Sequence, residues 1–201
     1  MLAWHFLSED KRLGYGDGRS VEVGVPLECD GEPALCDNGM HGSIRLIDAL
    51  RYASGPIVCR VEIEGDIIEG DDKLCGRRRT VLWMLDATEL LHEFACQCAE
   101  DALALVAEPD PRSVAAIAAK RKWLSGEITD EELADARAAA CAAARTAARN
   151  AEWADALAAA DAADAAADAS DARAAAWAAA IAKYDARLTE MVLEAHKDDA
   201  E

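Results

Sequence analysis

The feature that most constrains this chain is a long C-terminal stretch without helix-breaking residues. All five prolines lie at or before Pro111, and the last of the 12 glycines is Gly126. Between Ala134 and Ala182, 30 of the 49 residues are alanine. Because alanine has the highest helix propensity and no glycine or proline follows Gly126, we expect one long helix over about residues 129–197.

The residues before this stretch indicate a compact module of mixed secondary structure. Apolar runs predict strands over residues 2–7, 57–63 and 80–85. The alternation of valine with other residues over positions 21–25 predicts a further, half-buried strand. Ser43 is expected to cap a helix that ends before Gly55-Pro56.

Composition rather than charge marks the boundary between the two parts. Asp110 followed by Pro111 predicts the start of a helix over residues 111–124, and Thr129-x-x-Glu132 predicts the capping box of the next one. We therefore expect an α+β fold. Its two parts are an α+β module over residues 1–108 and a helical segment over residues 109–201, arranged as a coiled coil or a helical hairpin.

The charge balance excludes several classes of protein. The chain has 39 acidic and 21 basic residues, a net charge of −18. Such acidity argues against direct binding to a nucleic-acid backbone or to an anionic membrane surface. No apolar run approaches the ~20 residues of a membrane span. Seven irregularly spaced cysteines suit a reducing compartment, so we expect a cytoplasmic protein.

The large apolar residues of the long helix recur in steps of four and three, which is the spacing of a heptad seam. Alanine fills most of the seam between its two ends, so each turn buries little area and the seam needs a partner. We expect it to fold back on residues 111–124 or to pair with a second copy of the chain, and we favour a homo-oligomer. The large seam residues are Trp153, Trp177, Ile181, Tyr184, Leu188 and Met191.

A row of aspartates follows the same heptad register away from the seam. Its members are Asp161, Asp164, Asp168 and Asp171. One interpretation is that they keep an apolar helix in solution. The other is that their carboxylates mimic phosphates and occupy a partner that binds nucleic acid.

Cysteine, histidine and arginine supply the remaining candidates for chemistry. Cys36 and His41, or His92 and Cys96 four residues apart on a helix, offer zinc ligands or a Cys–His pair, but at no established ligand spacing, so we expect no metal site. The basic cluster Arg77-Arg78-Arg79 predicts either salt-bridged surface or a small anion pocket.

One block of the first hundred residues carries a specific pattern. It consists of Asp30-Gly31-Glu32, Leu35-Cys36, Gly39-Met40-His41-Gly42-Ser43, Asp48-Ala49-Leu50-Arg51-Tyr52-Ala53 and Ile57-Val58-Cys59-Arg60-Val61-Glu62. The block, within about residues 2–98, resembles a domain family of uncharacterised proteins carried by phages, prophages and actinobacteria. The resemblance implies a genomic setting and no particular reaction.

The same block is also similar to the middle of the ADP-ribosyltransferase-like folds, through a His-bearing strand, a Gly-x-His/Phe-x-Ser element, a helix ending in Ala-x-x-Tyr-Ala and a strand of Val-x-Val type. This resemblance implies that His5, His41 and Ser43 line a cleft for NAD. Such enzymes also need a carboxylate, and this chain has Arg78 where the resemblance places Glu. Glu62 and Glu64 are the candidate substitutes.

These observations favour binding over catalysis. We expect a non-enzymatic, phage-type interaction protein that binds a host or defence component, either a protein or a small nucleotide, without a cofactor. One alternative is an ADP-ribosyltransferase-like enzyme that uses NAD. A further alternative is an acidic inhibitor that mimics nucleic acid.

Overall fold

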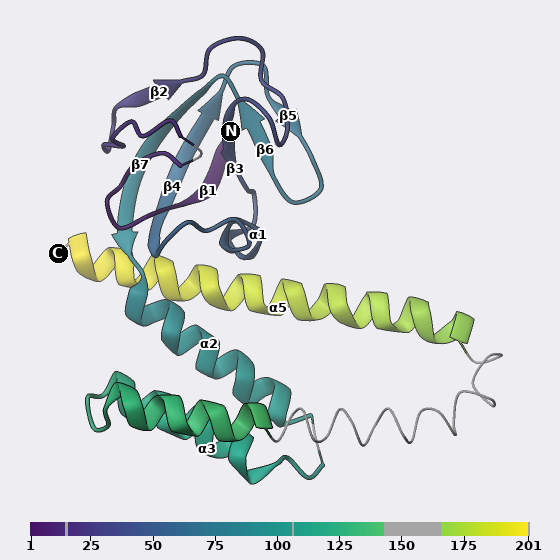
Figure 1. The fold of residues 1–201 in the computed structure, drawn as a ribbon. Helices are drawn as coiled ribbons and strands as arrows, with labels where there is room; N and C mark the ends of the chain where they lie inside the picture. The colour runs from purple at the N-terminus through teal and green to yellow at the C-terminus, as the bar shows by residue number, and fades with distance from the viewer. Residues whose placement is uncertain (15, 106, 143–165, 201) are drawn as a thin grey trace. The chain divides into compact units, whose positions relative to one another are not determined.

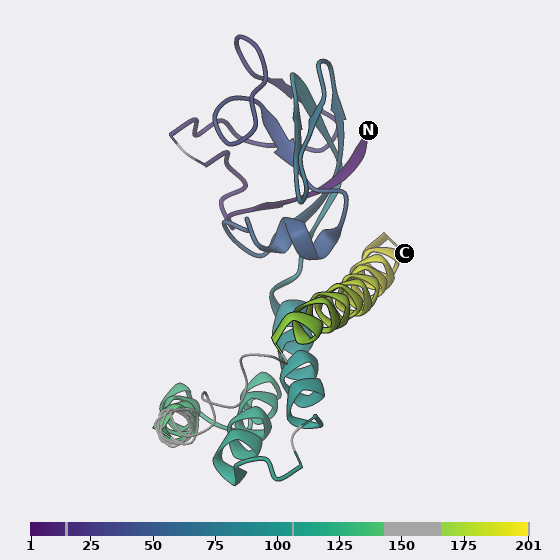
Figure 2. The same cartoon turned by 90° about the vertical axis from the view of Figure 1, so that its right-hand side faces the viewer.

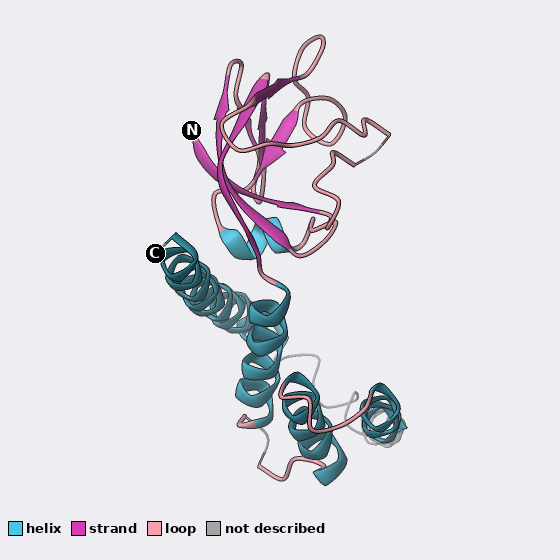
Figure 3. Cartoon of the chain, turned by 90° about the vertical axis from the view of Figure 1, so that its left-hand side faces the viewer, coloured by secondary structure: helices cyan, strands magenta, loops and turns pink. Residues whose placement is uncertain are grey.

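The computed structural model describes residues 1–14, 16–105, 107–142 and 166–200, with side chains throughout except for residues 166–178. The chain divides into two compact units. The first joins Met1–Leu91 to Ile181–Glu201, and the second is His92–Ala180. All strands of the described residues lie in the first unit (Figure 3). The predicted α+β class is therefore confirmed.

The main sheet of the first unit has four antiparallel strands in the order β1-β4-β7-β2 (Figure 1). Their bounds are Leu2–Leu7 for β1, Pro26–Glu28 for β2, Ile57–Glu64 for β4 and Arg78–Asp86 for β7. The strands predicted over residues 2–7, 57–63 and 80–85 are thus confirmed. β4 and β7 alternate buried and more exposed positions along part of their length, whereas β1 is buried at Ala3, Trp4, Phe6 and Leu7, on both of its faces.

A smaller sheet and a short helix complete the N-terminal part of this unit (Figure 2). The sheet has the order β3-β6-β5, from Met40–Gly42, Leu74–Gly76 and Ile68–Glu69. Helix α1 covers Leu46–Leu50. The backbone of Ser43 pairs with that of Trp4, which ties the end of β3 to β1.

Two local predictions were wrong. Positions 21–25 do not form a strand, because Gly24 has a φ of +77° and its N–H donates to the carbonyl of Val81, so the chain turns before β2. Ser43 does not cap a helix. Its N–H and C=O are both used by Trp4, and α1 begins three residues later at Leu46 without a side-chain cap.

The two faces of the main sheet are both covered. One face carries the apolar core, made of Ala3, Leu7, Val21, Ile57, Cys59, Val61, Ile63, Leu74 and Val81. The other face carries an aromatic group. Trp83 contacts Trp4 edge-on, with ring centroids 5.7 Å apart, and stacks on His196 at 4.0 Å. His196 belongs to helix α5, Ala166–Ala200.

The last turns of α5 pack into the first unit. Leu188 and Val192 are fully buried, and Asp185 Oδ1 accepts a hydrogen bond from the backbone N–H of Ile47 at 3.0 Å. The division of the chain therefore differs from the boundary expected at residue 108, because residues distant in sequence complete the first unit. The heptad spacing identified an apolar stripe here, and its Leu188 is buried by the same chain.

Several residues of the expected seam and acidic row cannot be placed. Trp153, Asp161 and Asp164 lie outside the described residues. Asp168, Asp171 and Trp177 are in the helical part of α5, but their side chains are outside the described set. The described parts of the stretch 129–197, residues 130–142 and 166–197, are helical.

The helices that follow the main sheet have well-defined starts. Helix α2, Thr88–Leu103, begins in the first unit after Asp86, whose carboxylate accepts from the N–H of Thr88 at 2.9 Å, and continues into the second unit. Helix α3, Pro111–Leu124, is capped by Asp110. The predicted capping box is present, since Thr129 and Glu132 exchange hydrogen bonds between side chain and backbone.

Arg121 of α3 forms ion pairs with Glu93 and Glu100 of α2, each at 2.7 Å. These two pairs hold the helices of the second unit against each other. Within the described parts of the chain, no helix is both long enough and apolar enough to cross a membrane.

Candidate functional site

A cavity of about 700 Å³ opens within the first unit, on the side of the main sheet that carries the apolar core. Its walls come from β1, β3, the loop over residues 29–39, the end of α1 and the first residues of β7. This volume lies in the range of pockets that bind small molecules. The polar side chains in its wall include His5, Asn38, His41, Lys73 and Arg79.

Arg79 is the most unusual of these residues because it is a cation with only 4% of its surface exposed. Its Nη1 donates to the backbone oxygen of His41 at 2.6 Å. Among the described residues, no carboxylate forms an ion pair with Arg79. Burial accordingly lowers the pKa of Arg79 from 12.5 to about 10. The charge of Asp17 acts on Arg79 from beyond ion-pair distance and neutralises it only in part. A buried cation of this kind at a cavity wall attracts an anion.

The other two arginines of the cluster have different surroundings. Arg77 pairs with Asp66 at 2.8 Å and donates to the backbone oxygen of Gly31. Arg78 is exposed and pairs with Glu28 at 3.0 Å and, more loosely, with Glu64. Because successive side chains of a strand point to opposite faces, Arg78 and Arg79 separate at the start of β7. Of the two readings of this cluster, salt-bridged surface fits Arg77 and Arg78, and an anion pocket fits Arg79.

His5 lies opposite Cys59 in the β1–β4 pairing and on the same face of the sheet. Burial lowers its pKa well below the usual 6.5, and the charges of Arg79 and His41 lower it further. Burial also raises the pKa of the Cys59 thiol to about 12. His5 is therefore neutral at neutral pH, and Cys59 is an unreactive core thiol.

His41 is held by two hydrogen bonds that define its state. Its Nδ1 lies 2.9 Å from the carbonyl oxygen of Gly39, and its Nε2 accepts the backbone N–H of Cys36 at 3.3 Å. A carbonyl only accepts, so we assign the proton to Nδ1 and the lone pair to Nε2. Burial lowers the pKa of His41, and the charges of Lys73 and Arg79 act in the same direction. The imidazole thus fixes the loop that carries Cys36.

Lys73 lies at the same end of the cavity. Its ammonium stands 4.4 Å from the centroid of the Tyr52 ring. The neighbouring side chain of Cys36 is the main cause that raises the pKa of Lys73. The Tyr52 hydroxyl donates to Asp72 at 2.7 Å, which orients the ring. Lys73 is consequently a second positive charge in the cavity wall.

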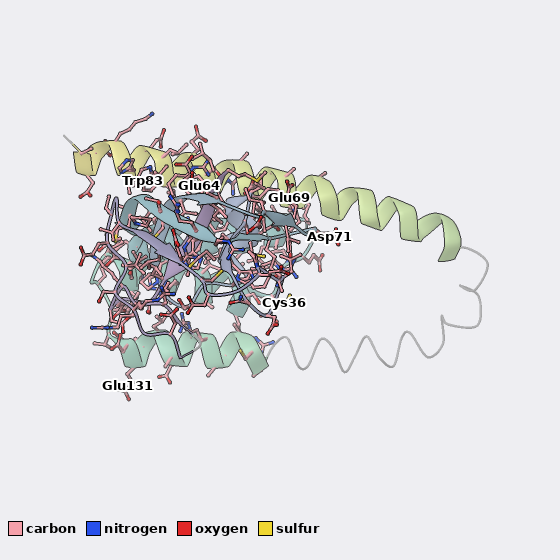
Figure 4. The ribbon with its side chains drawn as sticks, turned by 90° about the horizontal axis from the view of Figure 1, so that it is seen from above. Cys36, Glu64, Glu69, Asp71, Trp83 and Glu131 are labelled. Atoms are coloured by element: carbon pink, nitrogen blue, oxygen red, sulfur yellow. The ribbon has the colours of Figure 1, made fainter. Side chains whose placement is uncertain are left out.

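Of the residues named for an NAD cleft, three share this cavity. His5, His41 and Ser43 all line it, although Ser43 is buried. The two candidate carboxylates do not. Glu62 and Glu64 are exposed on one face of β4. Their neighbours Val61 and Ile63 point to the other face and are buried in the core. Seen from above, Glu64 lies well away from Cys36 of the cavity wall (Figure 4).

Asp17 and Asp37 do line the cavity, but Asp17 is already engaged by Arg19 through two short hydrogen bonds of 2.7 Å. Within the described part of the chain, no group of three or more His, Cys, Asp or Glu side chains is placed to hold a metal ion. His92 and Cys96 belong to the second unit, whereas Cys36 and His41 belong to the first.

Sequence reasoning passed over Lys73, Asn38 and Tyr52, and it did not single out Arg79 from its two neighbours. One signal for Arg79 was available, because it shares the strand parity of the apolar Val81 and therefore its face. No local pattern marks Lys73 or Tyr52, whose importance comes from contacts across the fold.

Residues 1–93 match the model of a family described as "Domain of unknown function (DUF7666)". The expected resemblance of the N-terminal part to an uncharacterised domain family is therefore confirmed. The matched residues include all those that line the cavity. No curated protein and no solved structure matches the chain.

Proposed function

We propose that the first unit is a binding module for a small phosphorylated ligand of nucleotide size, with the ligand's anionic group at Arg79. The observation that carries this proposal is the burial of the Arg79 guanidinium with no carboxylate within ion-pair distance among the described residues. A buried charge is costly unless an opposite charge neutralises it. A phosphate oxygen accepts the charge-assisted, forked hydrogen bonds that a guanidinium offers.

The other polar groups suit the same ligand. Lys73 adds a second cation to the wall, whereas His5 and His41 are neutral and so offer hydrogen bonds rather than charge. The cavity volume of about 700 Å³ exceeds what an inorganic phosphate needs. A phosphate attached to a larger organic body, such as a nucleotide, uses that volume.

Binding without turnover is the form of this function that we favour. Glu62 and Glu64 are exposed on the far side of β4, and Asp17 is occupied by Arg19. In this proposal the chain acts in a phage-type setting, where it captures a nucleotide of the host or of a defence system. The DUF7666 match is compatible with that role and names no activity.

A second candidate function is ADP-ribosyl transfer from NAD. It is favoured by one observation, that His5, His41 and Ser43, which the resemblance places in an NAD cleft, do line the same cavity. In this case Asp37, which lines the cavity, replaces the missing glutamate. Release of nicotinamide from NAD by the purified chain, lost in Asp37→Asn, distinguishes this function from binding alone.

The proposed binding is tested by calorimetric titration of the full chain with ADP, pyrophosphate and adenosine. We expect heat of binding from ADP and pyrophosphate but not from adenosine, which lacks the anionic group. Arg79→Met should abolish binding of ADP, and Arg78→Met, the neighbouring residue on the opposite face, should leave it unchanged. Equal binding of ADP by both variants, or no binding of either anion by the wild type, overturns the proposal.

A further inference from the structure

The two cations Arg79 and Lys73 enter the cavity at different points along strand β3. Arg79 belongs to β7, and its Nη1 donates to the backbone oxygen of His41 in β3. Lys73 directly precedes β6, whose first residue pairs with Gly42 of β3. The antiparallel register therefore places Lys73 beyond Gly42, on the side away from His41. Both cationic side chains line the cavity.

Most of the Arg79 guanidinium is available to a ligand. Among the described residues, only its Nη1 has a protein acceptor. No buried side-chain nitrogen or oxygen in this part of the chain lacks a hydrogen-bond partner, so Nε and Nη2 of Arg79 are not sealed in the core. Because Arg79 is 4% exposed and lines the cavity, these two nitrogens open into the cavity. They offer a pair of donors to one anionic group.

Lys73 also has no carboxylate within ion-pair distance among the described residues. Its neighbour Asp72 pairs with Arg51 at 3.3 Å and accepts the Tyr52 hydroxyl at 2.7 Å. The Lys73 ammonium stands 4.4 Å from the centroid of the Tyr52 ring, which positions the ammonium without neutralising its charge. In a chain of net charge −18, one cavity thus contains two cations without an ion-pair partner.

From these positions we infer that the ligand carries two separate anionic groups, one bound by Arg79 and the other by Lys73. The inference rests on the proposed function and narrows its ligand class. The register puts Lys73 opposite the position that follows Gly42, two residues or roughly 7 Å along the strand from His41. Cations attached at this separation suit anionic groups at different positions of the ligand. A nucleoside bisphosphate, with phosphates on two positions of its sugar, has this form.

The acidic residues of the cavity wall orient such a ligand. Asp30 and Asp37 line the cavity from the loop over residues 29–39, whereas Lys73 and Arg79 come from the start of β6 and of β7. Carboxylates repel phosphate groups and the two cations attract them. The phosphates therefore face the side of β6 and β7, and the base faces the loop.

The experiment is a calorimetric titration of the full chain with three adenine nucleotides. AMP carries one phosphate group, ADP carries two at the same end, and adenosine 3′,5′-bisphosphate carries two at different positions of the sugar. We expect the bisphosphate to bind roughly tenfold more tightly than AMP, the effect of one added hydrogen bond between charged groups. It should also bind more tightly than ADP.

Three variants test the role of Lys73. Lys73→Met should weaken binding of the bisphosphate by roughly tenfold and leave binding of AMP unchanged, since AMP binds through Arg79. Lys73→Arg keeps the charge and should keep the preference for the bisphosphate. Lys197→Met removes an equal charge from an exposed position on α5 and should change neither affinity. Melting curves show whether each variant is folded.

The outcomes separate this inference from the function on which it rests. Equal affinity of the wild type for AMP and the bisphosphate, or a preference that persists in Lys73→Met, overturns the second anionic group and leaves the proposed binding function standing. Binding of ADP as tight as that of the bisphosphate overturns the separation of the two groups. Binding of ADP that is absent, or unchanged by Arg79→Met, overturns the proposed function and this inference together.

Discussion

Asp185 and Ile47 are 138 residues apart in the chain, yet Asp185 Oδ1 accepts a hydrogen bond from the Ile47 backbone N–H at 3.0 Å. Ile47 lies in the first turn of α1, where backbone N–H groups have no partner within the helix. A carboxylate on α5 thus accepts a hydrogen bond from a backbone N–H in the first turn of α1 that has no partner within its own helix. Together with the buried Leu188 and Val192, this bond attaches α5 to the first unit.

We predict that Leu188→Ala destabilises the first unit strongly. Leu188 has no exposed surface, and removing a fully buried leucine side chain costs about 2–5 kcal/mol of unfolding free energy. Glu190→Ala, two residues away on the exposed side of α5, should change it by less than about 0.5 kcal/mol. Urea unfolding of both variants is the measurement, and equal midpoints would contradict the docking of α5.

Arg79→Met should stabilise the unliganded protein. Lowering the pKa of Arg79 from 12.5 to about 10 corresponds to roughly 3 kcal/mol against its charged form in the fold. Loss of the hydrogen bond from the charged guanidinium to the His41 oxygen costs about 1.5–3 kcal/mol. We therefore expect the unfolding free energy at pH 7 to rise by no more than about 1.5 kcal/mol. A decrease would mean that Arg79 is a structural residue rather than a ligand-binding one.

Acid should weaken the first unit before its carboxylates titrate. His5 and His41 both have a pKa below the usual 6.5 in the folded state, so the unfolded chain takes up protons first. The neutral histidines make their full contribution to the unfolding free energy above pH 6.5, the pKa of histidine in the unfolded chain. This contribution is lost as the pH falls from 6.5 through the lower pKa values of the folded state. The slope is at most about 1.4 kcal/mol per pH unit for each proton.

This pH dependence is measured by urea unfolding at intervals between pH 7.5 and 5. His5→Gln cannot take up a proton, so we expect a shallower decline of the unfolding free energy than in the wild type. The same slope in His5→Gln and wild type would show that His5 is accessible to protons in the folded state.

Gly76→Ala should be strongly unfavourable because the side chain of Ile63 and the backbone of Glu64 approach Gly76 closely. A Cβ at this position of β6 would stand 2.7 Å from Ile63 Cγ2 and 2.9 Å from the carbonyl oxygen of Glu64. We expect a loss of at least about 2 kcal/mol, with backbone shifts. Gly14→Ala is the matched control, since nothing lies within 4 Å of its Cβ. Similar melting temperatures for both variants would contradict the packing of β6 against β4.

Local features of this fold could be read from the sequence. The strands over residues 2–7 and 57–63 and the helix caps at Asp110 and Thr129 depend on neighbouring residues, and the patterns for them are strong. The strand predicted at positions 21–25 was wrong because alternation of valine does not reveal a glycine with positive φ. Strand propensity describes the residues of one segment, and it does not show whether the tertiary fold places that segment in a sheet.

The candidate site was only partly predictable. Placing His5 and His41 in one cavity agrees with what the resemblance implied, but the cation that most strongly marks the cavity was hidden among three arginines. The sequence also did not predict which part of the protein covers the apolar stripe around Leu188. Heptad spacing shows which side of a helix is apolar, whereas what covers that side depends on the tertiary fold.

The docking of residues 181–201 on the first unit has a consequence for the order in which the protein is made. A ribosome delivers the strands of the main sheet before residues 92–180, and the helix that stacks His196 on Trp83 emerges only after those residues. Until then the tryptophan-bearing face of the sheet is open to water and to chaperones. The first unit can therefore be completed only after all of residues 92–180 have been translated.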